Sequence, residues 1–290
     1  IMSKVLIATE KPFAAPAVAG IKQILSEAGF DVVLLEKYTA KSELLAAVAD
    51  VDAIIIRSDI IDKEVFDAAR QLKIVVRAGA GYDNVDLEAA TAHGVCVMNT
   101  PGQNANAVAE LVFALLLFSV RNRFNGTSGT ELKDKKLGLL AYGNTGRNVA
   151  RIAKGIGMDI YAYDPFTPAE VIEKEGVHAV ASQKELFSTC DVVSLHIPAT
   201  PETKGSIGRE LVSLLPKKAI LVNTARKEII NEPELIALLK EREDLRYLAD
   251  IRPAAHEEFE AAAGERYFST PKKMGAQTAE ANTNAGLAAA

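Results

Sequence analysis

The stretch that decides the fold is residues 138–164, GLLAYGNTGRNVARIAKGIGMDIYAYD. An apolar run that begins at Leu137 reads as a buried strand ending at Tyr142, and Asp159 to Tyr163 reads as a second strand. Between them come two glycines and a segment whose apolar residues recur at helical spacing. Strand, glycine turn, helix and strand in this order predict a βαβ unit of the dinucleotide-binding kind.

Each part of this unit has a predicted task. Gly143 lets the backbone approach a pyrophosphate, and Gly146 lets the helix pack closely on the first strand. The free N–H groups at the start of the helix attract phosphate. Asp164 follows Gly146 by 164 − 146 = 18 residues and can accept hydrogen bonds from ribose hydroxyls, so NAD is favoured over NADP. The predicted cofactor contacts here are Gly143, Asn144, Thr145, Gly146 and Asp164.

One position departs from the G-x-G-x-x-G pattern. Ala141 stands where the first glycine is expected, which leaves A-Y-G-N-T-G. An ordinary strand–turn–helix of any α/β protein is therefore an alternative interpretation of this segment. The strand before it, the helix after it and the acid at the right distance together favour cofactor binding.

Length and composition narrow the classes of protein that remain. A chain of 290 residues suits two domains, and 49% apolar with 24% charged residues is typical of a soluble globular protein. A net charge of −5 without a basic stripe argues against a nucleic-acid partner. Cys96 and Cys190 lack metal or redox spacing, which favours a reducing cytosol and predicts no metal site. Leu111 to Val120 is too short an apolar run to span a bilayer, and nothing resembles a signal peptide.

Strands and helices alternate along the whole chain. Short apolar strands are predicted at Val5–Thr9, Asp31–Leu35, Ala53–Arg57, Ile74–Arg77, Val95–Asn99, Val192–His196, Ile220–Asn223 and Tyr247–Asp250. Helices are predicted at 14–28, 41–48, 62–70, 86–93 and from Asn104 to about Phe118, and the polar stretch 121–136 reads as a linker. The last residues read as a helix that stops abruptly, so we expect the natural chain to continue past Ala290.

This alternation predicts an α/β protein with two Rossmann-like domains, each built on a parallel sheet. We expect a substrate-binding domain at 1–98, completed by 279–290, and an NAD-binding domain at 99–278. The substrate is expected in a cleft between the two.

Four ordered blocks resemble the D-2-hydroxyacid dehydrogenase family. RAGAGYDNVD (77–86) is similar to its substrate loop, and MNTPGQNANAVAEL (98–111) to its hinge and interface helix. SLHIPATPETKGSIG (194–208) and LVNTARKEIINEPELIALL (221–239) are similar to two later signature blocks. Within the family, the resemblance is greatest to short phosphoglycerate dehydrogenases that carry lysine in place of the catalytic histidine and lack a regulatory domain.

Arg226, directly after the strand Ile220–Asn223, is the first catalytic candidate. A guanidinium can bind the carboxylate of a 2-hydroxy acid through two parallel hydrogen bonds, which lysine cannot do. Its place at the carboxyl end of a parallel strand is where ligands bind in open α/β sheets. The alternative is a surface arginine that pairs with Glu228 or Glu234.

The base is the second candidate. The family places a histidine in a T-P-H-x-G-G-x-T stretch, and this chain reads STPKKMGAQT at 269–278. Counting back from Gly275 and Thr278 puts the lost histidine at Lys273, whereas counting forward from Pro271 puts it at Lys272. We favour Lys273, because the loop at Gly275 is expected to pack near the cofactor.

The family's glutamate partner of the histidine is also missing. Matching from Asp250 puts Ala255 at its position in DIRPAAHEEF (250–259). A carboxylate beside a lysine favours the ammonium and raises its pKa, so a lysine base instead needs burial or a neighbouring cation, and Arg226 can be that cation. Glu257 is the nearest substitute acid, with a solvated loop acid as the alternative. His256 is expected to be merely exposed, although it is a second candidate base.

The resemblance implies the remaining contacts. Arg57, Ser58 and Arg77 match positions that hold a substrate phosphate, the loop Ala78–Gly81 offers backbone N–H groups to the carboxylate, and Asn104 is a polar contact. Lys11 is a further phosphate candidate, with a surface lysine as the alternative. The substrate set is Arg57, Ser58, Arg77, Ala78, Gly79 and Asn104. The further cofactor set is His196, Pro198, Thr203, Thr224, Ala225, Asp250 and Gly275.

The resemblance implies NAD-dependent oxidation of D-3-phosphoglycerate to 3-phosphohydroxypyruvate, the entry step of serine biosynthesis, in a cytoplasmic homodimer without nucleic-acid or membrane partners. Two alternatives stay open. One is a glyoxylate or hydroxypyruvate reductase. The other is a non-catalytic NAD-binding protein similar to the corepressors that share this fold.

Overall fold

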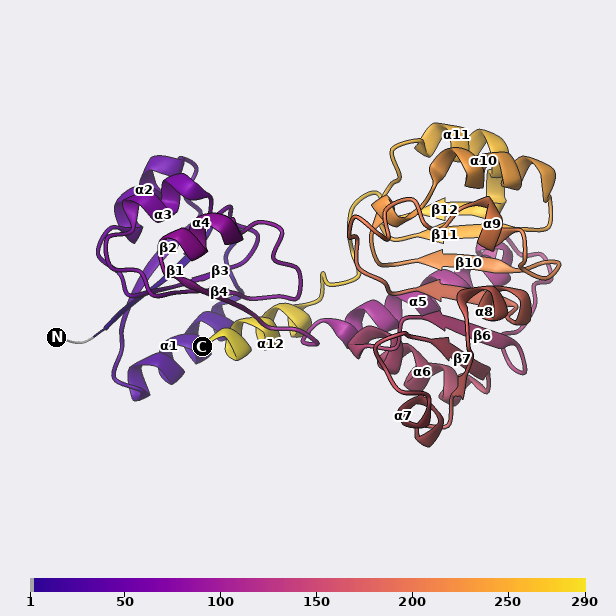
Figure 1. Cartoon of the computed structure of the whole chain (residues 1–290), viewed down its shortest axis with the longest axis horizontal. Coiled ribbons are helices and arrows are strands. Elements are labelled where there is room, and N and C mark those ends of the chain that lie inside the picture. The colour runs from indigo at the N-terminus through magenta and orange to yellow at the C-terminus, as the bar shows by residue number, and fades with distance from the viewer. Residues whose placement is uncertain (1–2) are drawn as a thin grey trace. The chain divides into compact units, whose positions relative to one another are not determined.

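A computed structural model describes residues 3–290, which divide into two compact units (Figure 1). The first unit runs to Asn104 and includes the C-terminal segment Gln277–Ala290, and the second is Ala105–Ala276. The sequence places the domain boundaries at 98/99 and 278/279, whereas the chain passes from one unit to the other after Asn104 and after Ala276. Residues 1 and 2 of the expected first domain lie outside the described residues.

The first unit is built on a five-stranded sheet in the order β2-β1-β3-β4-β5, with every neighbouring pair parallel. Its strands are β1 (Lys4–Thr9), β2 (Asp31–Glu36), β3 (Ala53–Ile56), β4 (Ile74–Arg77) and β5 (Cys96–Asn99). In the sheet, β2 lies on one side of β1, and β3, the next strand along the chain, lies on the other side. The carboxyl ends of β1 and β3 therefore mark the point where the strand order reverses, the usual place for a ligand in such a sheet.

Helices cover both faces of this sheet because successive side chains of its strands point to opposite faces. Val5 and Ile7 pack with α1 (Ala15–Glu27) and the C-terminal α12 (Ala279–Ala289), which lie side by side although they are far apart in sequence (Figure 1). Leu6 and Ala8 pack on the opposite face with the other helices. These are α2 (Lys41–Val48), α3 (Lys63–Ala68) and α4 (Leu87–Ala92).

The second unit has a seven-stranded parallel sheet in the order β12-β11-β10-β9-β6-β7-β8. Its strands are β6 (Lys136–Leu140), β7 (Asp159–Tyr163), β8 (His178–Ala179), β9 (Val192–Leu195), β10 (Ile220–Asn223), β11 (Arg246–Ala249) and β12 (Tyr267–Ser269). The order reverses between β6 and β9, so the segments that follow these two strands are the expected binding edge. The predicted α/β class with two parallel sheets is confirmed.

Two groups of helices sandwich this sheet. One face is covered by α5 (Ala105–Val120), α6 (Asn144–Ile156) and α7 (Ala169–Lys174). The other face is covered by α8 (Gln183–Thr189), α9 (Arg209–Val212), α10 (Glu232–Glu241) and α11 (His256–Ala263). Three short 3₁₀ segments complete the unit, η1 (Asn122–Phe124), η2 (Lys227–Ile229) and η3 (Gly264–Arg266).

Two local expectations differ from the structure. The strand β6 ends at Leu140 instead of Tyr142, because Ala141 takes a left-handed backbone conformation with φ of 81° that no strand can hold. The stretch 121–136 does not link the units. It lies inside the second unit, where Thr130 N–H donates to Val120 O at 2.8 Å and the Arg123 guanidinium donates to Tyr267 O.

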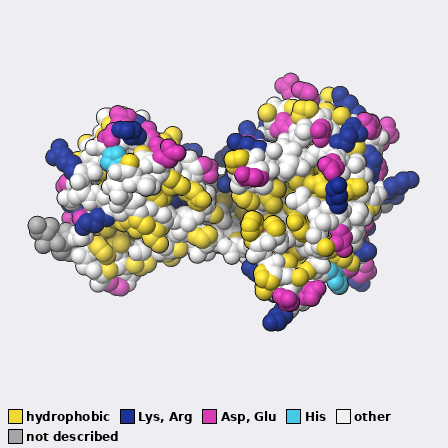
Figure 2. Space-filling view, in the orientation of Figure 1, with side chains coloured by type: hydrophobic (Ala, Val, Ile, Leu, Met, Phe, Trp, Pro, Cys, Tyr) yellow, Lys and Arg dark blue, Asp and Glu magenta, His cyan; other side chains and the backbone are white. Residues whose placement is uncertain are grey.

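The surface of each unit carries charges of both signs. On the face that Figure 2 shows, Lys and Arg side chains alternate with Asp and Glu, and no continuous basic stripe crosses it. Within residues 3–290, none of the helices combines the length and apolar character that crossing a membrane requires.

Gly146 provides a test of how α6 is packed. A Cβ at Gly146 would lie 2.5 Å from Ala141 O, whereas a Cβ at Gly155 of the same helix would meet nothing within 4 Å. We expect Gly146→Ala to lower the free energy of unfolding by about 1–3 kcal/mol through overpacking. Gly155→Ala should raise it by up to about 1 kcal/mol through helix propensity. Urea denaturation of both variants measures this, and equal effects would show that the close approach does not matter.

Candidate active site

The predicted phosphate loop opens at the carboxyl end of β6. Ala141 adopts the left-handed conformation that the motif's first glycine normally supplies, and Gly146 is required by its contact with Ala141 O. Gly143 is exposed, and a side chain there would meet nothing within 4 Å. The start of α6, with Asn144 and Thr145 in its first turn, is thus open to a pyrophosphate. The residues present fit the dinucleotide that the motif predicts.

Asp164 lies where β7 ends, close to the same loop. Its Oδ2 accepts the Tyr142 N–H at 2.8 Å and its Oδ1 accepts the Phe166 N–H at 2.8 Å. Each carboxylate oxygen keeps further lone-pair capacity, because an ionised carboxylate can accept about four hydrogen bonds. The two backbone contacts therefore orient the carboxylate beside the loop and leave it able to accept ribose hydroxyls.

The segment after β9 contains His196. Its Nε2 lies 2.9 Å from Ser194 Oγ. Burial, with a smaller effect from the positive charge of Lys273, lowers the pKa of His196 to about 4, so the ring is neutral near pH 7. Further along, the Thr203 hydroxyl donates to Pro198 O at 2.6 Å and accepts the Thr200 N–H at 2.7 Å. The side chain of Thr203 thus stabilises the turn at 198–203.

Lys273 reaches back to the end of β10. Its Nζ donates to Thr224 O and Ala225 O, each at 2.7 Å, and lies 3.5 Å from Asp250 Oδ2. Thr224 and Ala225 were expected to contact the cofactor, and here their carbonyls hold the lysine. The Thr224 hydroxyl is buried and has no hydrogen-bond partner among residues 3–290.

The charge of Lys273 is set by opposing effects. Burial, the largest, lowers its pKa below the ordinary lysine value, Asp250 raises it, and the nearby Arg226 guanidinium lowers it again. The net direction is downward. Arg226 itself donates to Ala225 O at 3.1 Å, and no carboxylate within the described chain forms an ion pair with it. Arg226 and Lys273 therefore form a two-cation site suited to an anion.

Asp250 has a role that the sequence did not reveal. Its Oδ1 accepts Thr270 Oγ1–H and Met274 N–H, and its Oδ2 accepts Gly275 N–H, all at 2.8 Å. A Cβ at Gly275 would lie 3.0 Å from this oxygen. The carboxylate is fully buried and shapes the 270–275 loop, instead of standing open to the cofactor as expected. In the sequence, this role is indicated only by the position of Asp250 at the end of the apolar run of β11.

The expected acid and the second candidate base lie elsewhere. Glu257 is exposed on the first turn of α11, and none of its contacts within the described residues reaches Lys273. His256 is not merely exposed. Its Nδ1 lies 2.9 Å from the Tyr267 hydroxyl and its Nε2 lies 3.3 Å from Glu260 Oε1, so it is a half-buried structural residue. Lys272, the other candidate base, is exposed.

The first unit holds the predicted substrate loop. Ala78 N–H donates to Ile56 O, and Gly79 N–H donates to the Thr100 hydroxyl, both at 2.8 Å. These two amides are therefore committed to the fold and cannot serve a carboxylate as expected. Arg77 Nη1 donates to Ala78 O at 2.9 Å, and a Cβ at Gly79 would lie 1.3 Å from Nη1. Glycine is required at position 79 because the guanidinium occupies the side-chain space.

The other substrate candidates end strands or loops of the same unit. Arg57 follows β3, its neighbour Ser58 is exposed, and Asn104 is half-buried at the last residue of the first segment. Arg57 Nη1 donates to Lys11 O at 2.8 Å, so Lys11 contributes its backbone to the arginine.

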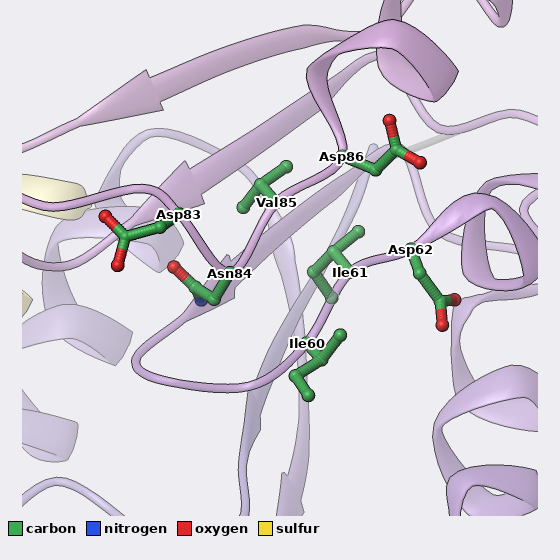
Figure 3. Close-up of a pocket in the computed structure, with 7 residues that line it drawn as sticks. All are labelled: Ile60, Ile61, Asp62, Asp83, Asn84, Val85 and Asp86. Atoms are coloured by element: carbon green, nitrogen blue, oxygen red, sulfur yellow. The ribbon is translucent and has the colours of Figure 1, made fainter. Parts of the chain in front are cut away.

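An open hollow in the first unit does not suit an anionic substrate. Figure 3 shows the side chains of loops 60–62 and 83–86 around it, with three aspartates among them. Asp62 caps α3 by accepting the Val65 N–H, and Asp86 caps α4 by accepting the Ala89 N–H. Capping explains these carboxylates, and their charge would repel a hydroxy acid.

Comparison with known proteins identifies the family. Residues 117–271 match the family described as D-isomer specific 2-hydroxyacid dehydrogenase, NAD binding domain. The chain therefore belongs to the D-isomer specific 2-hydroxyacid dehydrogenases and contains their NAD binding domain. Its second unit, with the loop at Gly143, is the part that matches.

Individual relatives are similar over most of the chain. A D-3-phosphoglycerate dehydrogenase of Methanocaldococcus jannaschii is 38% identical over 268 residues, which are 85% of this chain and 50% of the relative. A hydroxypyruvate reductase of Thermotoga maritima is 36% identical over 219 residues, 71% of this chain and 70% of the relative. The crystal structure of 3-phosphoglycerate dehydrogenase from Entamoeba histolytica, with NAD+ bound, is 48% identical with a TM-score of 0.87, covering 100% of this chain and 93% of that one. The chain spans about half the length of the curated phosphoglycerate dehydrogenases that it matches.

The coupling between His196 and Lys273 is testable. Lys273→Met removes the nearby positive charge, so we expect the pKa of His196 to rise from about 4, while Lys272→Met leaves it unchanged. A folded pKa below the unfolded value of about 6.5 means that His196 stabilises the fold above that pH and loses this contribution as the pH falls towards 4. NMR titration of the four histidines measures it, and a wild-type His196 that titrates near 6.5 would contradict the burial argument.

Proposed function

We propose that the chain oxidises D-3-phosphoglycerate to 3-phosphohydroxypyruvate with NAD, the entry step of serine biosynthesis. The observation that carries the proposal is the pair Arg226 and Lys273 at the carboxyl edge of the NAD binding domain's sheet. Relatives named for this activity support it. That the substrate lies between the two units stays a prediction.

When bound, NAD supplies the acceptor for the hydride that leaves C2 of the substrate. Arg226 binds the substrate carboxylate through charge-assisted hydrogen bonds. Lys273 in its neutral form accepts the proton of the C2 hydroxyl as the carbonyl forms. In the reverse direction the ammonium returns that proton. The orienting carboxylate of Lys273 is then Asp250, and Glu257 has no part in proton transfer.

The lowered pKa of Lys273 explains how a lysine can act as a base here. A lysine of ordinary pKa near 10.4 is almost wholly protonated at neutral pH. Burial and Arg226 bring the neutral form within reach, and the carbonyls of Thr224 and Ala225 keep Nζ in place. Asp250 acts in the opposite direction and limits the lowering of the Lys273 pKa.

Cofactor choice follows from Asp164. A carboxylate anchored by two backbone N–H groups beside the phosphate loop favours the ribose hydroxyls of NAD and repels the additional phosphate of NADP. The two free thiols, Cys96 and Cys190, suit a reducing compartment, and we assign the protein to the cytoplasm on that ground.

The similarity to a hydroxypyruvate reductase supports a second candidate function, reduction of an unphosphorylated 2-keto acid. The same catalytic pair serves that reaction. Arg57 and Arg77 at the ends of β3 and β4 favour the phosphorylated substrate, because two guanidinium groups exceed what a lone carboxylate needs. A non-catalytic NAD-binding protein would need neither pair.

The role of Lys273 is tested by its removal. Lys273→Ala should lower kcat for NADH formation from D-3-phosphoglycerate by roughly two to four orders of magnitude, and Lys272→Ala much less. In the unaltered protein, oxidation should increase with pH through an apparent pKa below lysine's usual value, since only the neutral amine accepts a proton. Near-normal kcat with an unchanged pH profile in Lys273→Ala would refute the lysine-base mechanism, and turnover of unphosphorylated acids alone would favour the second candidate.

We further propose a homodimer that forms through α5. Half of the residues of this helix are buried inside its own unit, so only its other side can face a partner. An exposed stripe remains, and it includes Leu117, 43% exposed, with Phe124, 69% exposed, just beyond the helix. Leu117 and Phe124 supply apolar area that a second copy of the chain would cover.

Leu117→Glu tests the dimer. Placing a charge in an apolar interface should raise the dimer dissociation constant by about tenfold or more. Leu214→Glu, at a leucine that is 38% exposed elsewhere in the same unit, is the matched control. Sedimentation equilibrium at micromolar concentration distinguishes the two, and a wild-type monomer would rule out the proposed assembly.

A further inference from the structure

Arg57 occupies the ligand-binding edge of the first unit. It follows β3 directly, beside the end of β1, where the strand order of the sheet reverses. Open parallel sheets bind ligands outside this edge. The side chain at this point therefore influences what the first unit can bind.

The Arg57 guanidinium is held entirely by neutral groups. Nη1 donates to Lys11 O at 2.8 Å and Pro12 O at 3.0 Å, and Nη2 donates to Asn282 Oδ1 at 2.8 Å. Its carbon lies 5.4 Å from the centre of the Phe13 ring. Three of its five N–H donors are used, and two remain.

The charge of Arg57 is balanced only in part, because the nearby Asp59 carboxylate raises its pKa less than burial lowers it. No ion pair to it exists in the described part of the chain, although the side chain is half-buried, and burial lowers its pKa. The carboxylate of Asp59 forms its hydrogen bonds with other groups and not with the guanidinium. It accepts the Tyr38 hydroxyl at 2.8 Å and the backbone N–H groups of Glu10 and Arg57 at 2.7 and 3.1 Å. A half-buried cation with spare donors and no ion pair favours an external anion.

The position of Asn282 is set by close packing of the C-terminal helix α12. A Cβ at Gly20 of α1 would lie 2.5 Å from Leu287 Cδ2 of α12. A Cβ at Gly286 would lie 3.1 Å from atoms of Ile21 and Phe13. Glycines on both helices thus allow α12 to approach α1 and the ring beneath Arg57, which fixes where the Asn282 amide meets the guanidinium.

We propose that Asn282 is a specificity-determining positioning residue, whose neutral amide orients Arg57 without neutralising it and so preserves an anion site for the phosphate of the substrate. The inference rests on the proposed function and extends it to the C-terminal helix. A carboxylate at position 282 would form an ion pair with the guanidinium and compete with phosphate. The competing interpretation is that Arg57 is only a clamp that ties α12 to the loop after β1.

The experiment compares Asn282→Asp with Asn284→Asp. Both place one negative charge on α12, but Asn284 is exposed and outside the Arg57 contacts. Steady-state kinetics give kcat and KM for D-3-phosphoglycerate and D-glycerate, and calorimetry measures the binding of inorganic phosphate. Asn282→Gln tests rescue by an amide, and thermal unfolding of each variant verifies that it folds.

We expect Asn282→Asp to raise KM for D-3-phosphoglycerate by roughly tenfold or more, with a much smaller change in kcat and in KM for D-glycerate. Asn284→Asp should change either KM by less than about twofold, and Asn282→Gln should restore most of the affinity. Equal KM effects of the two aspartates, or equal losses for both substrates, would overturn the proposal in favour of the clamp.

Phosphate binding separates this proposal from the proposed function. If the wild-type protein fails to oxidise D-3-phosphoglycerate, the proposed function is wrong. The inference is then still supported if wild type binds inorganic phosphate and Asn282→Asp binds it roughly tenfold more weakly, and it is overturned if the two bind alike. If Asn282→Asp fails to fold, Asn282→Gln is compared with Asn282→Leu instead. Only the variant with an amide should keep its affinity for phosphate, and equal affinities would overturn the proposal.

Discussion

The buried carboxylate of Asp250 is the interaction on which the candidate site depends. It accepts three hydrogen bonds from the 270–275 loop at 2.8 Å while lying at the end of β11, so it ties a loop without regular structure to the rigid edge of the sheet. Lys273 belongs to that loop, and its amine reaches the carbonyls after β10 because Asp250 holds the backbone in place. A buried carboxylate needs such donors, since an unsatisfied one would be very costly.

The same carboxylate also bears on the proposed use of Lys273 as a base in place of a histidine. Asp250 lies 3.5 Å from the Lys273 amine and opposes the effect of burial on its pKa, while Arg226 reinforces that effect. Orientation and charge are thus supplied by different groups. The backbone carbonyls and Asp250 position the amine, and burial together with Arg226 makes its neutral form accessible.

Each unit has an arginine at its binding edge that forms no ion pair with a carboxylate of the described chain. Arg226 in the second unit and Arg57 in the first are held by backbone or amide oxygens, and within residues 3–290 neither has a carboxylate partner. Acceptors of this kind fix the geometry of a guanidinium but leave its charge available. The net charge of the chain is negative, so these local sites, and not the overall charge, must attract an anionic substrate.

The sequence by itself determined the fold class, the parallel sheets and the strand–turn–helix at Gly143, because apolar periodicity and glycine spacing are local signals. The preference for Lys273 over Lys272 stays a prediction. Tertiary structure decided what those signals do not carry. The three-residue strand β12 was too short to show periodicity, and the fold of 121–136 depends on contacts such as Arg123 with Tyr267, far away in the chain. The tasks of Asp250, His256 and Asn282 are likewise set by partners from distant segments. A side chain's hydrogen-bond partners depend on which strand ends and loops the fold brings together, and spacing along the sequence does not record that.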